Sequence, residues 1–147
     1  MPIIYLDNCA LQRPLDNRDQ LRIRIEAEAI TAVLEAVESD KVELATSAAL
    51  RAESSRSSQQ NRRDFVQKIL SLARHEAPKA ETFMARIKVY GELGMAPFDA
   101  MHLASAVSMR ADFFCSTDDR LLRKARMANT ETTRVVTPLE LAQALNL

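Results

Sequence analysis

The first seven residues, Met1-Pro2-Ile3-Ile4-Tyr5-Leu6-Asp7, are short, apolar and rich in isoleucine, and they show no helical period. This pattern predicts a strand that is buried on both faces of a parallel sheet. An aspartate directly after such a strand lies at the carboxyl edge of the sheet, where open α/β sheets bind their ligands. Asp7 is therefore the first candidate site residue.

Strand-like and helical segments alternate along the rest of the chain. Alternation of this kind is typical of a parallel sheet covered by helices on both faces. We therefore expect an α/β fold with three layers, α/β/α, around a central, mostly parallel sheet of four to five strands. The expected strands are 1–7, 42–46, 113–115 and 134–136, and the expected helices are 19–38, 47–54, 62–74, 79–93, 97–110, 119–127 and 138–145.

Two details of this arrangement are further predictions. The helices at 62–74 and 79–93 follow each other closely, so we expect them to form a helical hairpin. Residues 54–61 are polar and lack an apolar period, which favours a mobile loop.

Length and composition limit the kind of protein. A chain of 147 residues that is 47% apolar and 27% charged is long enough for one domain with its own core, so residues 1–147 are expected to be a single domain. The net charge is zero, which does not indicate a strongly nucleic-acid-seeking protein. Residues 55–90 nevertheless hold eight basic residues against three acidic ones, as a solvated helix face or a phosphate-contact surface would.

The cysteines and the amino terminus bear on the compartment. Cys9 and Cys115 have neither paired nor metal-type spacing, and they fit small buried residues of a reducing environment. The sequence shows no signal peptide and no apolar run of membrane-spanning length. We expect a cytoplasmic protein without membrane attachment.

Four acidic residues far apart in the sequence occupy positions that the expected fold brings together: Asp7, Glu53, Asp99 and Asp118. Each has an ordinary explanation, such as capping, a helix dipole or a solvated face. Together they form an all-oxygen cluster, and clustered carboxylates repel each other unless a cation neutralises them. Oxygen donors favour Mg²⁺ or Mn²⁺ over zinc or copper, so the cluster predicts a divalent-metal site.

Two other classes of protein are disfavoured. Gly91 and Gly94 are the only glycines, so the chain has no glycine-rich phosphate-binding loop. Phosphatases of the haloacid-dehalogenase type place a nucleophilic aspartate after the first strand, but they need a second aspartate two residues later. That position is Cys9, which argues against a phosphoaspartyl mechanism.

The chain resembles the PIN-domain nucleases, and within them the VapC-type toxins, over nearly its whole length. The resemblance rests on four segments in order: Tyr5 to Asp7, Ser47 to Glu53, the run DAMHLA at residues 99–104, and Ser116 to Asp118 followed by Arg120-Leu121-Leu122.

The resemblance implies roles for the acidic residues. Asp7, Glu53, Asp99 and Asp118 would form the catalytic centre, with Asp7, Asp99 and Asp118 as ligands of Mg²⁺ or Mn²⁺. The metal would activate a water for phosphodiester hydrolysis, and no protein nucleophile is required.

The chain also departs from the family pattern. Cys9 replaces the usual Asn or Ser, and Asp119 competes with Asp118, although the spacing from Ser116 favours Asp118. The family usually places a Thr or Ser at the position of Ser116 to orient the site, and His102, which shares the helical face of Asp99, has a structural or a catalytic role.

The resemblance further implies an endoribonuclease acting on RNA, a homodimer, and an antitoxin protein that inserts a segment into the acidic groove. The alternative is a catalytically inactive PIN-like module that acts through dimerisation or partner binding, with Met84 or Tyr90 exposed on the expected hairpin.

Overall fold

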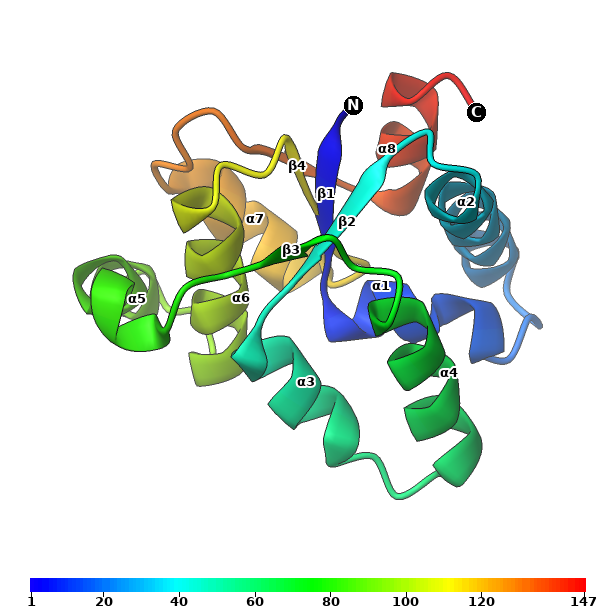
Figure 1. Cartoon of the computed structure of the whole chain (residues 1–147), viewed down its shortest axis with the longest axis horizontal. Helices are drawn as coiled ribbons and strands as arrows, with labels where there is room; N and C mark the ends of the chain where they lie inside the picture. The colour runs from blue at the N-terminus through cyan, green and yellow to red at the C-terminus, as the bar shows by residue number, and fades with distance from the viewer.

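The computed structural model describes residues 1–147 and contains a five-stranded parallel sheet in the order β3-β2-β1-β4-β5 (Figure 1). Every pair of neighbouring strands is parallel. The strands are β1 (Ile3–Leu6), β2 (Glu43–Thr46), β3 (His75–Glu76), β4 (Phe113–Cys115) and β5 (Arg134–Val136). The expected four to five strands in a mostly parallel sheet are confirmed.

Helices cover the sheet on both sides. In Figure 1, α2 and α8 lie on one side of the sheet, and α6 and α7 lie on the other. This arrangement confirms the three-layer α/β/α architecture. The helices are α1 (Asn8–Gln12), α2 (Leu21–Glu38), α3 (Ala48–Ser55), α4 (Gln60–Leu70), α5 (Met84–Glu92), α6 (Pro97–Ser108), α7 (Asp119–Met127) and α8 (Pro138–Ala144), with 3-10 turns η1 (Arg13–Leu15) and η2 (Ala80–Phe83).

The first strand lies at the centre of the sheet. Ile4, Tyr5 and Leu6 are completely buried, as the apolar run predicts. The backbone of Tyr5 pairs with Ala45 of β2 on one side and with Phe114 of β4 on the other. The chain builds outward from β1 first toward β3 and later toward β5, so the strand order reverses between β1 and β4. Asp7 therefore follows a strand at the topological switch point, where ligands bind in such sheets.

The expected helical hairpin is wrong. Helix α4 packs against α1 and α3, whereas α5 packs against α6, and Figure 1 shows α4 and α5 on opposite sides of the molecule. Between them, β3 joins the edge of the sheet, and its pairing with β2 is extended by a bond from Arg74 N to Leu44 O of 2.9 Å. A strand of two residues is too short to produce a periodic apolar pattern, so the sequence gives no signal for it.

The loop expected over residues 54–61 is shorter in the structure. Helix α3 continues to Ser55 and α4 begins at Gln60, so only residues 56–59 connect the two helices. Polar residues on exposed helix ends lack an apolar period for the same reason that loop residues do, and this caused the misassignment.

No helix in the chain combines the length and the hydropathy that crossing a membrane requires.

Candidate functional site

Asp7 lies directly after β1 and begins α1. Its backbone N–H donates to Cys115 O at 3.1 Å, which continues the ladder between β1 and β4. Its side chain accepts a hydrogen bond from Ala10 N at 3.0 Å and so caps the short helix α1. The residue is 3% exposed, and burial raises the pKa of its carboxyl group. The strand and the cap together hold this carboxylate in one position.

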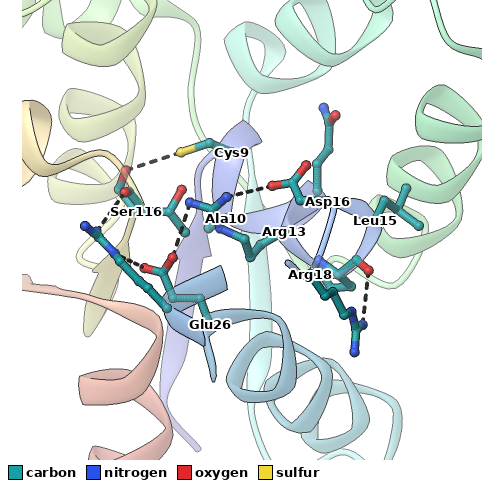
Figure 2. A network of polar contacts seen from close by, with 12 residues as sticks. Cys9, Ala10, Arg13, Leu15, Asp16, Arg18, Glu26 and Ser116 are labelled. Carbon is teal, nitrogen blue, oxygen red and sulfur yellow. Dashed lines mark hydrogen bonds and ion pairs between the residues drawn. The ribbon is translucent and has the colours of Figure 1, made fainter. Parts of the chain in front are cut away.

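Cys9 supports Asp7 from within the first turn of α1. Its thiol donates to the two carboxylate oxygens of Asp7 at 3.1 and 3.3 Å. Figure 2 shows that the sulfur also faces the Ser116 hydroxyl, at 3.5 Å. Burial raises the pKa of the Cys9 thiol to about 12, so the thiol keeps its proton and remains a donor at neutral pH. Cys9 therefore supplies a hydrogen bond to Asp7 at this position.

The segment after Asp7 is fixed by a network of ion pairs. Arg13 contacts Asp16 at 2.8 Å and the buried Glu26 of α2 at 3.2 Å, as Figure 2 shows. Arg62 of α4 reaches the same Asp16 at 2.9 Å. These contacts attach η1 to α2 and α4, and they hold the chain that follows Asp7 against both helices.

Asp99 stands in the first turn of α6, after the proline that begins the helix. It is partly exposed, and its pKa is raised to about 6. Burial is the main cause, and the negative charges of Asp7, Asp118 and Glu53 raise the pKa further, whereas His102 lowers it. The fold therefore brings Asp99 within electrostatic reach of all three other acidic residues of the predicted site.

Asp118 and Asp119 have different roles in the structure. Asp118 is the N-cap of α7, and its Oδ1 accepts hydrogen bonds from Arg120 N at 2.9 Å and Leu121 N at 3.2 Å. Asp119 is held by the guanidinium of Arg22 through two bonds of 2.7 and 2.8 Å, which lower the pKa of Asp119. Both carboxylate oxygens of Asp119 are thus bonded to Arg22 of α2. Asp118 uses only Oδ1 for the cap, so its Oδ2 is available to a ligand.

Glu53 ends a buried chain of hydrogen bonds. Its Oε1 lies 2.9 Å from His102 Nε2, and His102 Nδ1 lies 2.9 Å from the Tyr5 hydroxyl. The Tyr5 hydroxyl lies 2.7 Å from Ser47 Oγ. His102 and Tyr5 are completely buried, and burial raises the pKa of Tyr5, so the phenol keeps its proton. The chain connects β1, α3 and α6 and fixes one oxygen of Glu53.

A cleft of about 300 Å³ contains both acidic and basic groups. Asp99 and Asp118 line it together with Arg120 and Lys124 of α7. Lys124 Nζ is held in place by a hydrogen bond of 2.6 Å to Gly94 O. Carboxylates and cations therefore lie side by side in one opening next to the carboxyl edge of the sheet.

The acidic residues fit a divalent metal by the chemistry of their donors. All four are carboxylates, and the pKa of Asp99 is raised mainly by burial and further by the negative charges of the other three. A hard cation offsets that repulsion, and oxygen donors are the ligands that Mg²⁺ and Mn²⁺ prefer. In this conformation no three His, Cys, Asp or Glu side chains are grouped closely enough to form a metal site on their own.

The sequence did not reveal several groups that position the site. The Ser47 and Tyr5 hydroxyls complete the chain to Glu53, and Arg22 binds Asp119. Tyr5 and Ser47 begin two of the segments that carry the family resemblance, but the sequence did not indicate that their hydroxyls bond to each other. Ser47 carried one partial signal, because it was recognisable as the N-cap of α3, and its Oγ accepts from Leu50 N at 3.1 Å. The other contacts join residues far apart in the sequence.

Comparisons with known proteins agree with the fold. The family model described as PIN domain matches residues 4–127. The solved structure of FitAB bound to an IR36 DNA fragment is similar with a TM-score of 0.57 and 19% identity, covering 92% of this chain and 94% of that one. The crystal structure of PAE2754 from Pyrobaculum aerophilum has a TM-score of 0.56 and 16% identity, covering 99% of this chain and 90% of that one.

No curated protein matches the sequence. The family model extends from β1 to the end of α7 and so includes all four acidic residues of the candidate site. The family expected from the sequence is confirmed: the chain belongs to the PIN domain family.

Proposed function

We propose that this protein is a metal-dependent endoribonuclease that hydrolyses RNA phosphodiester bonds. PIN domains are generally nucleases, and the chain carries an acidic residue at each of the four expected positions. One observation carries the proposal: Asp99 and Asp118 line the same cleft, and the pKa of Asp99 is raised by burial and, beyond that, by the negative charges of Asp7, Asp118 and Glu53. A fold has no structural need to bring four carboxylates together.

The proposed metal ligands are Asp7, Asp99 and Asp118. A bound Mg²⁺ or Mn²⁺ supplies a Lewis acid and a water with a lowered pKa. The chain supplies the positions: Asp7 is fixed by α1 and Cys9, and Asp118 by the first turn of α7. Glu53 has one oxygen on His102 and the other free to orient a water.

The cleft beside these acids suits a strand of RNA. Arg120 and Lys124 line the same opening as Asp99 and Asp118. Cations of this kind bind phosphate groups, and they sit where a neighbouring phosphate of the cleaved strand would lie. The net charge of the protein is zero, so attraction of RNA would depend on local groups of cations such as this one.

The biological role that we propose is that of the toxin in a type II toxin–antitoxin pair, acting as a cytoplasmic homodimer. The resemblance to VapC-type toxins supports this role, and a solved structure of FitAB bound to a DNA fragment shares the fold. An antitoxin would reach the acidic cleft, and an Arg from it would pair with the carboxylates there.

A second candidate function is partner binding without catalysis. Met84 and Val89 of helix α5 are 56% and 53% exposed, and Leu93 directly after the helix is 41% exposed. Tyr90 does not belong to this surface, because it is 1% exposed and donates to Asn129 O at 2.7 Å. Asp99→Asn separates the two functions, since it abolishes cleavage by an enzyme and leaves partner binding by a scaffold intact.

The direct test is cleavage of a mixed pool of single-stranded and structured RNA by the purified protein in Mn²⁺ or Mg²⁺. Asp7→Asn is the matched variant, because Asn can still accept the bond from Ala10 N that caps α1. We expect cleavage by the wild type that both EDTA and Asp7→Asn abolish. Cleavage that survives either control would rule out the proposed mechanism.

A further inference from the structure

We propose that Arg56 and Phe98 form a stacking platform that holds a base of single-stranded RNA beside the acidic centre. The inference rests on the proposed ribonuclease function and names two residues that bind the substrate. Arg56 ends α3, three residues after Glu53, and Phe98 directly precedes Asp99 in α6. Both members of the platform are therefore neighbours in sequence of the proposed catalytic acids.

Three planar groups follow one another at this point of the molecule: the Arg56 guanidinium, the Phe98 ring and the His102 imidazole. The guanidinium carbon of Arg56 lies 5.0 Å from the centre of the Phe98 ring. The Phe98 ring is nearly parallel to the His102 imidazole, with an interplanar angle of 16° and 6.1 Å between centroids. His102 in turn bonds Glu53. The stack thus leads from the acidic centre outward and ends on Arg56 at the surface.

The charge of Arg56 is not neutralised by the protein. Its side chain is exposed, and it forms neither an ion pair nor a hydrogen bond within the chain. Neighbouring arginines behave differently, since Arg51 pairs with Glu76 at 3.1 Å and Arg62 with Asp16 at 2.9 Å. Arg56 therefore presents one free planar face and its full set of N–H donors to solvent.

These are the features that bind single-stranded RNA. Unpaired bases stack on aromatic rings and on guanidinium planes, and the guanidinium donors also reach phosphate oxygens. Phe98 is partly exposed, so a base can lie against its edge or on the outer face of Arg56. A base in a duplex has no free face, which is why the platform selects an unpaired nucleotide next to the cleavage position.

The test compares variants that change the stack and little else. Arg56→Lys keeps the positive charge but removes the planar group, and Phe98→Leu keeps an apolar side chain but removes the ring. Arg134→Lys is the matched control, because Arg134 lies 5.2 Å from the Phe113 ring in the same geometry on β5. Affinity for a single-stranded RNA is measured by fluorescence anisotropy in an Asp99→Asn background, where no cleavage occurs.

We expect Arg56→Lys and Phe98→Leu each to weaken RNA binding about ten-fold, and Arg134→Lys to leave it unchanged. In the cleaving protein, the same two variants raise KM about ten-fold while kcat stays within about two-fold. Removing single bases from the RNA in turn should identify one nucleotide whose base matters to wild type but not to Phe98→Leu.

Wild-type affinity in Arg56→Lys would overturn the inference, and this result does not depend on whether Phe98→Leu folds. Thermal melting identifies a Phe98→Leu protein that is unfolded. A wild type that neither cleaves nor binds RNA refutes the proposed function itself, and the platform with it. Cleavage by a wild type whose Arg56→Lys variant is equally active refutes the platform alone.

Discussion

At the scale of single residues, Asp99 is the acid with the most informative environment. Burial and three neighbouring carboxylates raise its pKa to about 6, so its charge at neutral pH costs folding free energy. This cost is absent below the pKa of an unfolded aspartate and appears as the pH rises through about 6. The stability of the metal-free protein should therefore fall over this interval.

Asp99→Asn removes that cost. At pH 7.5 and without metal, we expect the unfolding free energy of the variant to exceed that of the wild type by about 1 kcal/mol, after allowance for solvent screening of a partly exposed group. The variant should therefore melt at a higher temperature. At pH 4 the two proteins should melt together. Calorimetric melting curves at both pH values test this, with Asp64→Asn on the exposed face of α4 as the control. An equal shift at both pH values would contradict the electrostatic explanation.

We propose that His102 is a positioning residue, because it bonds Glu53, the proposed water-orienting acid. Replacing it with Gln breaks the link between the Tyr5 hydroxyl and Glu53. We expect kcat to fall about ten-fold to a hundred-fold with little change in KM, because the free oxygen of Glu53 loses its orientation.

His75→Gln is the matched control for this substitution. His75 Nε2 lies 2.8 Å from Glu43 Oε2, so the pair has the same chemistry as His102 and Glu53 but joins β3 to β2. Single-turnover cleavage should be unchanged in His75→Gln. If both variants lose activity equally, or if His102→Gln retains full kcat, His102 has only a structural role.

At the scale of secondary-structure elements, Asp118 combines two functions that substitution can separate. Its Oδ1 caps α7, while its charge belongs to the acidic cleft. Asn caps helices as well as Asp does, so Asp118→Asn should lose activity and keep its stability. Asp118→Ala should lose both, with a cost of about 1 kcal/mol in unfolding free energy.

Urea unfolding combined with RNA cleavage measures both effects of Asp118. Thr137→Ala provides the reference for a lost cap, since Thr137 forms the capping box of α8 with Glu140, and neither residue lines the cleft of Asp99 and Asp118. This variant should lose about 1 kcal/mol and keep full activity. Full cleavage activity in Asp118→Asn would remove Asp118 from the proposed metal ligands.

The elements that the sequence predicted well are those with a clear apolar pattern. The run from Ile3 to Leu6 and the helix over Leu21–Glu38 formed as expected, because burial of one face determines each. Helix α1 and strand β3 escaped prediction because each is too short to show an apolar period. The hairpin prediction failed for the same reason, since β3 separates its two helices.

The candidate site divides in a similar way. Asp7, Asp99 and Asp118 stand at strand ends or helix starts, which are visible in the sequence. The bonds that hold Asp7 and Asp118 are local as well, because their donors lie two or three residues further along the chain. The bonds that position Glu53 and Asp119 are not visible in the sequence, because Tyr5 and His102 are 97 residues apart, as are Arg22 and Asp119. Long-range contacts of this kind follow from the register of the sheet, which only the folded structure supplies.

At the scale of the whole molecule, the fold explains why distant acids converge. Five parallel strands direct their carboxyl ends to one edge, and the order reverses between β1 and β4 beside Asp7 and Ser116. The neighbouring helices α3, α6 and α7 then bring in the remaining acids from three other parts of the chain. A metal ion bound there would connect several elements at once.

Metal binding should therefore stabilise the entire protein. A ligand that binds only the folded state adds about 2.7 kcal/mol at a concentration one hundred times its Kd. We expect Mn²⁺ to raise the melting temperature of the wild type and EDTA to reverse the effect. Buffer without added metal should leave the melting temperature unchanged. A wild type whose melting temperature is unaffected by Mn²⁺ would show that the folded state has no metal preference.

Asp7, Glu53, Asp99 and Asp118 are proposed to form one divalent-metal centre. The most direct test is a calorimetric titration of the purified wild type with Mn²⁺, alongside Asp99→Asn and the exposed control Asp64→Asn. We expect saturable binding to the wild type and to Asp64→Asn, and its loss in Asp99→Asn. Absence of binding to the wild type, or equal binding to all three proteins, would contradict it.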